Sequence, residues 1–398
     1  MNTTHNMFAS VSLGLMASMG GVALAEGGGD PRVEIIEQPA ASNDIGNFVF
    51  SDDGELRLFH VYEHTDSDIY RYETGEWTLI RRELWAVVPG ITPIDVSTDG
   101  SVLLMTDFGK TEVLSGRATF TMPKQWTYAD TIGGHSHQRH VWGSVYAGHV
   151  SSDGRVVTLR GVASDDHSPG SDSLVWAGGS DLVNISNGLP RGEGISYGAG
   201  VPNVDGSVVA FSQHLADGDS NIWVWASGIL TELPRLDPLS GEDRDLRAVS
   251  ADGERIFGND ESDARGGFWG YWNHLNEAYD GSRPIQHPST AWVWSQKDGI
   301  VPIFDEARFL ETSIWDINDE GTMALIEARP IGSNDWERYL WYGEDNFVLI
   351  DDLLAPMGLP DYIRGFGFWQ ISGDGSKLMG ATYIDNRIHA VTVEIPVR

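Results

Sequence analysis

The chain has 398 residues and a formal net charge of −32, because 58 acidic residues stand against 26 basic ones. Such a chain repels phosphate groups, which argues against nucleic acid and anionic membrane surfaces as partners. The absence of cysteine excludes disulfides, thiolate metal sites and a catalytic thiol. Only four of the basic residues are lysine, and this acidic, lysine-poor composition favours a marine or halophilic source, where salt screens the repulsion.

The first 25 residues predict a signal peptide. Residues 7–25 form an apolar stretch of mostly small residues that ends in an Ala-x-Ala pattern at Ala23 and Ala25. The region before it lacks Lys and Arg, and an uncleaved membrane anchor is the alternative. We expect a signal peptide over 1–25, one domain over 26–398, no membrane insertion after cleavage, and a periplasmic or extracellular location.

A short pattern then recurs seven times along the chain. In each copy an apolar run leads into a small polar residue, an acidic residue and a glycine, and a second apolar run follows. The copies lie at 48–54, 95–100, 149–154, 203–206, 248–253, 317–321 and 371–375. An Asp-Gly pair between alternating apolar runs predicts a two-residue hairpin turn with positive φ at both central positions. The glycines are 46 to 68 residues apart, as expected for structural repeats.

A second pattern follows the first within most repeats. An aromatic run ends in a glycine turn at 69–75, 174–178, 222–228, 291–299 and 339–343, with a poorer match at 112–116. Two hairpins per repeat give four strands, which is typical of propeller blades. Strand-like runs at 32–37 and 390–395 would pair and close a ring. We therefore predict an all-β, seven-bladed β-propeller of four-stranded antiparallel blades, closed by pairing of the chain termini. Two separate β domains are the alternative.

These repeats resemble those of the TolB translocation protein's propeller and the HAF-type extracellular repeats of bacteria. Both use a Ser-x-Asp-Gly hairpin followed by a Trp- or Tyr-rich strand and a glycine turn. The resemblance covers about residues 40–398. It implies a fold and carries over no catalytic residue, because propellers serve many unrelated purposes.

Strand topology predicts which face carries function. Label the strands of a blade a to d from the centre outward. The a–b and c–d turns are short and must lie on one face, so the b–c connections and the d-to-a crossings lie on the other. Long connections are where binding sites are usually built. Eight histidines map to this long-connection face: His64, His135, His137, His140, His167, His214, His274 and His287.

The cluster His135, His137 and His140 has three interpretations. Histidines at this spacing could ligate a transition metal. A neutral histidine paired with a tyrosine could abstract and return protons during polysaccharide cleavage, and the catalytic candidates are then His135, His137 or His140 with Tyr197 and Arg139. The third interpretation is a solvated polar loop.

A second group of candidates lies in the longest insertion. Phe268, Trp269, Tyr271 and Trp272 offer flat apolar faces for stacking on sugar rings or on a protein partner. With His274, His167 and His214 they form the predicted ligand-binding set. The alternative is a loop that buries its own aromatic side chains against the propeller.

Asp217, Asp219 and Asn221 have the oxygen spacing of the first positions of a calcium loop. Gly228 stands where such a loop needs its last carboxylate, so an EF-hand is rejected and a turn is the alternative to a calcium site. We expect no cofactor, with structural calcium at this loop as the alternative.

The sequence therefore predicts an exported propeller, expected to be a monomer, that binds a glycan or protein ligand on its long-connection face. A polysaccharide lyase that uses His, Tyr and Arg on that face is the alternative, and the sequence leaves open whether the protein is an enzyme. A structural repeat protein without a ligand is a third interpretation.

Overall fold

The computed structural model describes most of the chain. The described residues are 33–36, 44–63, 66–73, 75–84, 92–107, 110–115, 118–121, 127–132, 135–140, 142–163, 170–178, 182–190, 194–216, 219–234, 243–261, 290–333, 335–357, 359, 367–384 and 387–395. The predicted signal peptide over 1–25 therefore lies outside them.

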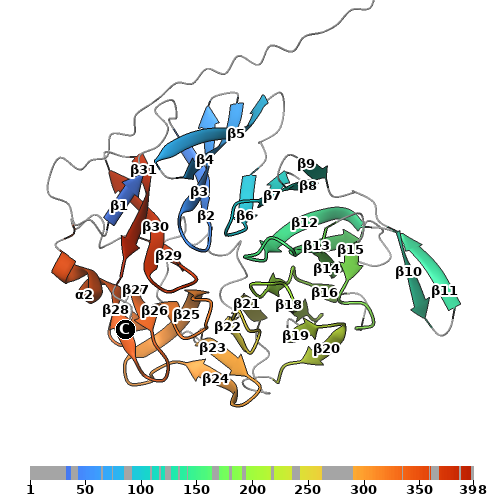
Figure 1. Ribbon diagram of the computed structural model, residues 1–398. Helices are drawn as coiled ribbons and strands as arrows, with labels where there is room; N and C mark the ends of the chain where they lie inside the picture. The colour runs from blue at the N-terminus through green and yellow to red at the C-terminus, as the bar shows by residue number, and fades with distance from the viewer. Residues whose placement is uncertain are drawn as a thin grey trace, which may run out of the picture.

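Seven antiparallel sheets form a ring, and they follow one another in chain order from blue to red in Figure 1. Blade 1 contains β2 (Asp44–Phe50), β3 (Leu56–Glu63), β4 (Asp66–Glu73) and β5 (Glu76–Leu84). Blade 2 contains β6 (Thr92–Val96), β7 (Val102–Asp107), β8 (Lys110–Ser115) and β9 (Ala118–Thr121). Blade 3 contains β12 (Trp142–Val150), β13 (Val157–Ala163), β14 (Ser171–Trp176) and β15 (Leu182–Asn184).

Blade 4 has a divided first strand, and its members are β16 (Ser196–Tyr197), β17 (Val201–Pro202), β18 (Val208–His214), β19 (Ser220–Ala226) and β20 (Ile229–Glu232). Blade 5 contains β21 (Asp243–Val249), β22 (Arg255–Glu261), β23 (Thr290–Ser295) and β24 (Gly299–Ile303). Blade 6 contains β25 (Phe309–Ile317), β26 (Ala324–Pro330), β27 (Glu337–Trp341) and β28 (Phe347–Leu349). Blade 7 contains β29 (Phe368–Ile371), β30 (Lys377–Ile384), β31 (Arg387–Glu394) and, from the other end of the chain, β1 (Val33–Ile36).

The termini close the ring as the sequence predicted. Strand β1 pairs antiparallel with β31, with Val33 opposite Val393. The buried Arg57 of blade 1 stabilises this junction by binding both terminal strands. Its Nη2 donates to Glu34 Oε2 in β1 at 2.5 Å and to Thr392 Oγ1 in β31 at 3.1 Å. The last blade is thus built from both ends of the chain and is tied to the first.

The core lies between neighbouring blades. One buried cluster joins Leu104 and Val113 of blade 2 to Val145 and Leu159 of blade 3. Strands β6, β12, β17, β21, β25 and β29 each contact the innermost strand of a neighbouring blade. Because every sheet buries both faces against its neighbours, the hydrophobic effect stabilises the ring as a whole.

Four of the described elements fall outside the blades. A short helix, α2 (Ile350–Leu354), and a 3₁₀ turn, η1 (Ala355–Met357), lie between blades 6 and 7 and bury Ile350, Leu354 and Met357. Strands β10 (Thr127–Ile132) and β11 (His135–His140) form a separate two-stranded sheet between blades 2 and 3. Figure 1 shows this hairpin at the right, outside the ring.

Candidate functional site

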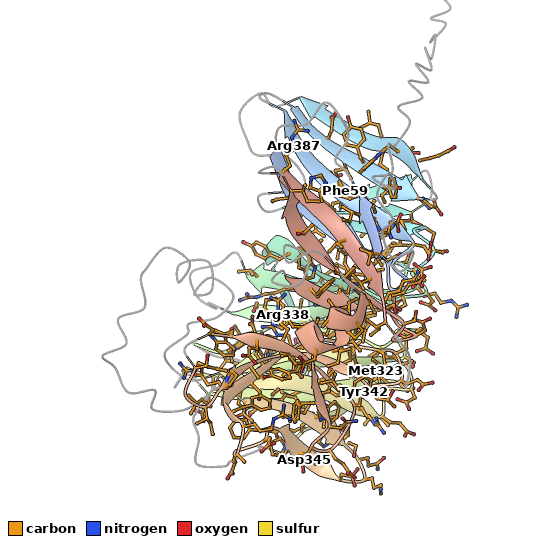
Figure 2. The ribbon with its side chains drawn as sticks, turned by 90° about the vertical axis from the view of Figure 1, so that its left-hand side faces the viewer. Phe59, Met323, Arg338, Tyr342, Asp345 and Arg387 are labelled. Carbon is orange, nitrogen blue, oxygen red and sulfur yellow. The ribbon has the colours of Figure 1, made fainter. Side chains whose placement is uncertain are left out.

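The two ends of the ring differ, as the topology predicted. In Figure 2, which views the ring from its side, Arg338 and Arg387 lie toward one face, and Met323 and Tyr342 lie toward the other. Arg338 and Arg387 stand near b–c connections, whereas Met323 and Tyr342 stand beside an a–b and a c–d turn. We call these ends the long-connection face and the turn face.

The turn face repeats one hydrogen-bonded turn. In blade 1, Ser51 Oγ donates to Asp53 Oδ1 at 2.6 Å and accepts from the amide of Leu56 at 3.0 Å. The same carboxylate accepts from the amide of Glu55. Equivalent bonds surround the first residue of four other turns: Ser97, Ser151, Ser250 and Ser372. The recurring Ser-x-Asp-Gly pattern is therefore a turn that caps its own backbone.

The type of this turn corrects one detail of the prediction. The seven glycines have φ between +62° and +72°, but the acidic residues before them do not have positive φ. The amide of Gly54 donates to the carbonyl of Ser51, so the turn spans four residues and only its last position needs glycine. A longer turn with one left-handed residue fits the strand twist as well as a two-residue turn does.

Main-chain hydrogen bonds join the turns of successive blades around the axis. The amide of Thr98 donates to Ser152, that of Asp153 to Val204, that of Ala251 to Asp319, that of Asp319 to Gly373, and that of Gly373 to Asp52, at 2.6 to 3.1 Å. Because these bonds connect neighbouring blades, they hold the innermost strands together at the turn face.

A β-bulge interrupts the innermost strand of several blades at the same height. The pairing register skips one residue in each of these strands, three residues before the Ser or Asn of the turn. The skipped residues are Ile94, Arg247, Trp315 and Trp369. Bulges re-aim side chains and are frequent beside functional sites. These four positions therefore offer chemically different side chains on a shared scaffold.

Acidic side chains tie innermost strands to their neighbours. Asp95 Oδ2 of blade 2 accepts from the amide of Val150 in blade 3 at 2.8 Å. Asp316 Oδ2 of blade 6 accepts from the amide of Ile371 in blade 7 at 2.9 Å. Burial, together with the charges of Asp52 and Asp95, raises the pKa of Asp316 to about 8. At neutral pH, Asp316 is therefore largely protonated.

Blade 3 carries exposed side chains that can donate hydrogen bonds or transfer protons. Tyr146 is 44% exposed on the innermost strand, directly opposite Arg160 on the next. Arg160 Nε donates to Ser171 Oγ at 3.0 Å, which orients its guanidinium. Three residues beyond Tyr146, His149 Nδ1 lies 3.6 Å from Asp95 Oδ2. A phenol, a guanidinium and an imidazole–carboxylate pair thus occur on one blade and its neighbour.

Tyr197 and His214, both predicted from sequence, are neighbours in blade 4. Tyr197 is 1% exposed, and its hydroxyl donates to the carbonyl of Pro190 at 2.5 Å and accepts from Gln213 at 3.0 Å. His214 lies within hydrogen-bonding distance of Ser212 and Ser220. In this structure Tyr197 anchors the blade, whereas the half-buried His214 stands at its long-connection end.

The predicted histidine cluster is a strand of the peripheral hairpin. His135, His137, Arg139 and His140 all belong to β11, with His135 opposite Ile132. The interpretation as a loop was wrong for the backbone, because β10 supplies an antiparallel partner that the sequence pattern did not reveal. The roles proposed for these four side chains remain predictions.

The remaining candidates lie largely outside the described residues. These are His64, His167, Asp217, Phe268, Trp269, Tyr271, Trp272, His274 and His287. Of the predicted calcium loop, Asp219 accepts the amide of Leu215 through its carbonyl, and Asn221 donates to Gln213. The first contact joins the two ends of the b–c connection and the second joins strands β18 and β19. Calcium binding remains a prediction.

Two features are absent from the described residues. No group of three or more His, Asp or Glu in that part of the chain is arranged to hold a metal ion. Among the same residues, no helix is long and apolar enough to cross a membrane.

Seven four-stranded blades around one axis, closed by the N-terminal strand, define a seven-bladed β-propeller. Solved structures agree on this class. The chain is similar to an oligogalacturonate lyase in complex with manganese, with a TM-score of 0.54, 11% identity, and coverage of 87% of this chain and 88% of that one.

Other similar structures are further propellers. A putative TolB from Agrobacterium tumefaciens has a TM-score of 0.41 at 14% identity and covers 81% of this chain and 95% of its own. The Cps50 (Swd1) propeller domain from Myceliophteria thermophila has a TM-score of 0.47 at 11% identity. The match covers 92% of this chain and 100% of that one. No protein-family model and no curated protein matches the chain. At these identities the likeness extends to the fold alone.

Sequence reasoning missed Tyr146, Arg160 and the pair Asp95–His149. It searched the long connections, whereas these residues lie on the inner strands of blades 2 and 3. One signal was available, because charged and polar residues at the innermost strand of a buried repeat depart from its apolar pattern.

Proposed function

We propose that this propeller binds a glycan or a protein ligand at its long-connection face, in the periplasm or outside the cell. One observation carries the proposal: the described a–b turns bond to one another on the turn face, whereas the connections of variable length gather at the opposite end. Surfaces built from variable connections on a rigid scaffold are where propellers and other repeat folds place recognition.

Exposed side chains on the innermost strands add to the proposal. Tyr146 and Ile94 stay exposed on innermost strands, although most of their neighbours there are buried. An exposed tyrosine beside Arg160 can stack on a sugar ring and donate hydrogen bonds to its hydroxyl or carboxyl groups. The insertion that contains Trp269 and Trp272 would add further stacking surfaces.

A second function, cleavage of an acidic polysaccharide by β-elimination, is supported by the same blade. Arg160 can pair with a carboxylate, and Tyr146 or His149 can accept or return a proton. The net charge of −32 opposes binding of an anionic polymer, so recognition without catalysis is the leading proposal.

The test uses full-length mature protein and a panel of neutral and uronic-acid polysaccharides. Binding is measured by glycan array and calorimetry, and cleavage by the ultraviolet absorbance of unsaturated products, in high salt with and without calcium. The double variant Trp269→Ala/Trp272→Ala tests stacking by the insertion, Tyr146→Phe tests the phenol, and Trp77→Phe in the aromatic core of blade 1 is the matched control.

We expect the tryptophan double variant to lose binding of the glycan or protein ligand. Binding should survive in Tyr146→Phe and in the control. An unsaturated product that disappears in Tyr146→Phe would establish the lyase instead. Absence of any binding and any product across the panel, together with no protein captured by cross-linking on intact cells, would overturn both.

A further inference from the structure

The turns of blades 6, 7 and 1 meet at the axis in an arrangement found at no other described junction. The second residue of the turn is acidic in blades 6 and 1, where it is Asp319 and Asp52, and glycine in blade 7, where it is Gly373. A Cβ atom placed on Gly373 would lie 2.6 Å from Asp319 Oδ2 and 2.9 Å from Asp52 Oδ2. The two carboxyl groups therefore occupy the space above this glycine.

The main chain fixes the same three residues. The amide of Asp319 donates to the carbonyl of Gly373 at 2.8 Å, and the amide of Gly373 donates to the carbonyl of Asp52 at 2.9 Å. Blade 7 is the blade assembled from β1 and β31. The carboxyl pair thus bridges the two neighbours of the closing blade.

Two carboxyl groups in contact must share a proton. Burial raises the pKa of Asp52, and the neighbouring charge of Asp319 raises it further, while a hydrogen bond to Ser152 acts in the opposite direction. Burial also raises the pKa of Asp319, and its hydrogen bond with Asp52 lowers it. The two carboxyl groups therefore titrate as a pair, and the hydrogen bond between them forms when one of the two carries the shared proton.

The surroundings add negative charge. The charge of Asp53, in the same turn, raises the pKa of Asp52, and the charge of Asp374 in blade 7 raises that of Asp319. The charge of Asp52 in turn raises the pKa of Asp316 in blade 6. The nearby cation Lys377 is bound to the carbonyl of Asp53 and to the carboxylate of Glu55. Within the described part of the chain, no ion pair joins a cation to Asp52 or Asp319.

We propose that a hydrogen bond between the carboxyl groups of Asp52 and Asp319 holds blades 1 and 6 together across Gly373. Because this bond needs the shared proton, closure of the ring weakens when the proton is lost at alkaline pH. The sign follows from linkage. Both carboxyl groups have raised pKa values in the folded protein, so the folded state binds more protons than the unfolded state above about pH 4. Stability from this pair is complete in acid and is lost as pH rises through the folded pKa values.

The test compares the pH dependence of thermal unfolding in the wild-type protein, Asp52→Asn and Asp319→Asn at constant high salt. Asparagine keeps one donor and one acceptor at every pH, so it imitates the protonated acid. Glu320→Gln is the matched control, because it removes the same charge from the exposed next position of the same turn. Subtracting the variants from the wild type removes the shared contribution of the histidines.

Between pH 6 and pH 9 the melting temperature of the wild type should fall by about 3 °C or more relative to either asparagine variant. Glu320→Gln should follow the wild type. Amide exchange in β1 and β31, corrected for its intrinsic rate, should rise about tenfold over this range in the wild type and stay level in the variants. Equal pH slopes in the wild type and both variants would overturn the proposal, and so would exchange that rises equally in all proteins.

Discussion

The turn face and the long-connection face are built on opposite principles. On the turn face one solution recurs, in which a Ser or Asn caps the turn and a glycine ends it. In five blades an Asp between them also accepts bonds from a side chain and an amide, as Asp99 does between Ser97 and Gly100. On the other face each blade has its own connection, from the b–c turn that Leu215 closes to the peripheral hairpin β10–β11. The comparison teaches that repetition serves ring assembly and that variation is available for recognition.

The largest expected effect is a loss of stability caused by a substitution on the turn face. Gly206 has a φ of +69°, and a Cβ there would lie 2.2 Å from Val156 Cγ2 of the preceding blade. Gly206→Ala should lower the free energy of unfolding by about 3 kcal/mol, because a left-handed alanine is strained and the interface is overpacked. Urea unfolding measures it.

Gly228→Ala is the matched control for that variant. Gly228 ends a c–d turn with a φ of +83° and has open space around its Cβ position. It should lose only about 1 kcal/mol from backbone strain. Equal losses at the two sites would mean that contacts between blades contribute nothing at the turn face.

A smaller effect is expected where the ring closes. Arg57→Ala removes a buried guanidinium that binds Glu34 and Thr392. Because Glu34 is half exposed, the expected loss is about 2 kcal/mol rather than that of a fully buried pair. Thermal unfolding measures it, and Arg155→Ala, which removes an exposed pair with Asp153, should change stability by less than about 0.5 kcal/mol. A loss of stability as small as that of Arg155→Ala would contradict a role of Arg57 in closing the ring.

The turn acids predict a pH response opposite to that of the axial pair. Bonds from the backbone amide and side chain of Ser101 lower the pKa of Asp99. Stability from this group is therefore present above the unfolded pKa and is lost as pH falls through the folded one. Asp99→Asn should destabilise at pH 7 and flatten the decline toward pH 3, as measured by urea midpoints. Asp345→Asn, at an exposed turn, is the control, and an unchanged acid limb in Asp99→Asn would contradict the expectation.

The smallest effect on stability is expected at the peripheral hairpin. Strands β10 and β11 form their own sheet and add no strand to any blade. Replacing 127–140 with a short Gly-Ser linker should therefore shift the melting temperature by less than about 2 °C. A larger fall would show that the hairpin supports the ring, and loss of ligand binding without a fall would locate recognition there.

Much of the fold was predictable because it is encoded locally and seven times. Each copy of Ser-x-Asp-Gly specifies a turn through bonds within six residues, such as that from the Leu56 amide to Ser51. Alternating apolar runs then supply the strands. Pairing of the two terminal runs, observed between β1 and β31, followed from the need to remove free edges. The helix α2 was not predicted, because its five residues are too few to produce a helical period.

The candidate site was less predictable, because its members come together through the tertiary structure. Tyr146 and Arg160 are opposite each other only because β12 and β13 pair in that register. The sequence alone also could not distinguish a buried tyrosine, as at Tyr197, from an exposed one. Both lie on inner strands, and burial depends on the neighbouring blade.

By itself, the sequence determined a seven-bladed ring with a repeated turn on one face and variable connections on the other, because these depend on local turn chemistry and strand period. Only the tertiary structure decided that Asp52 and Asp319, which are 267 residues apart in the chain, meet above Gly373. The physical reason is closure of the ring, which brings its first repeat close to its last two. Burial at that contact raises the pKa values of the two carboxyl groups.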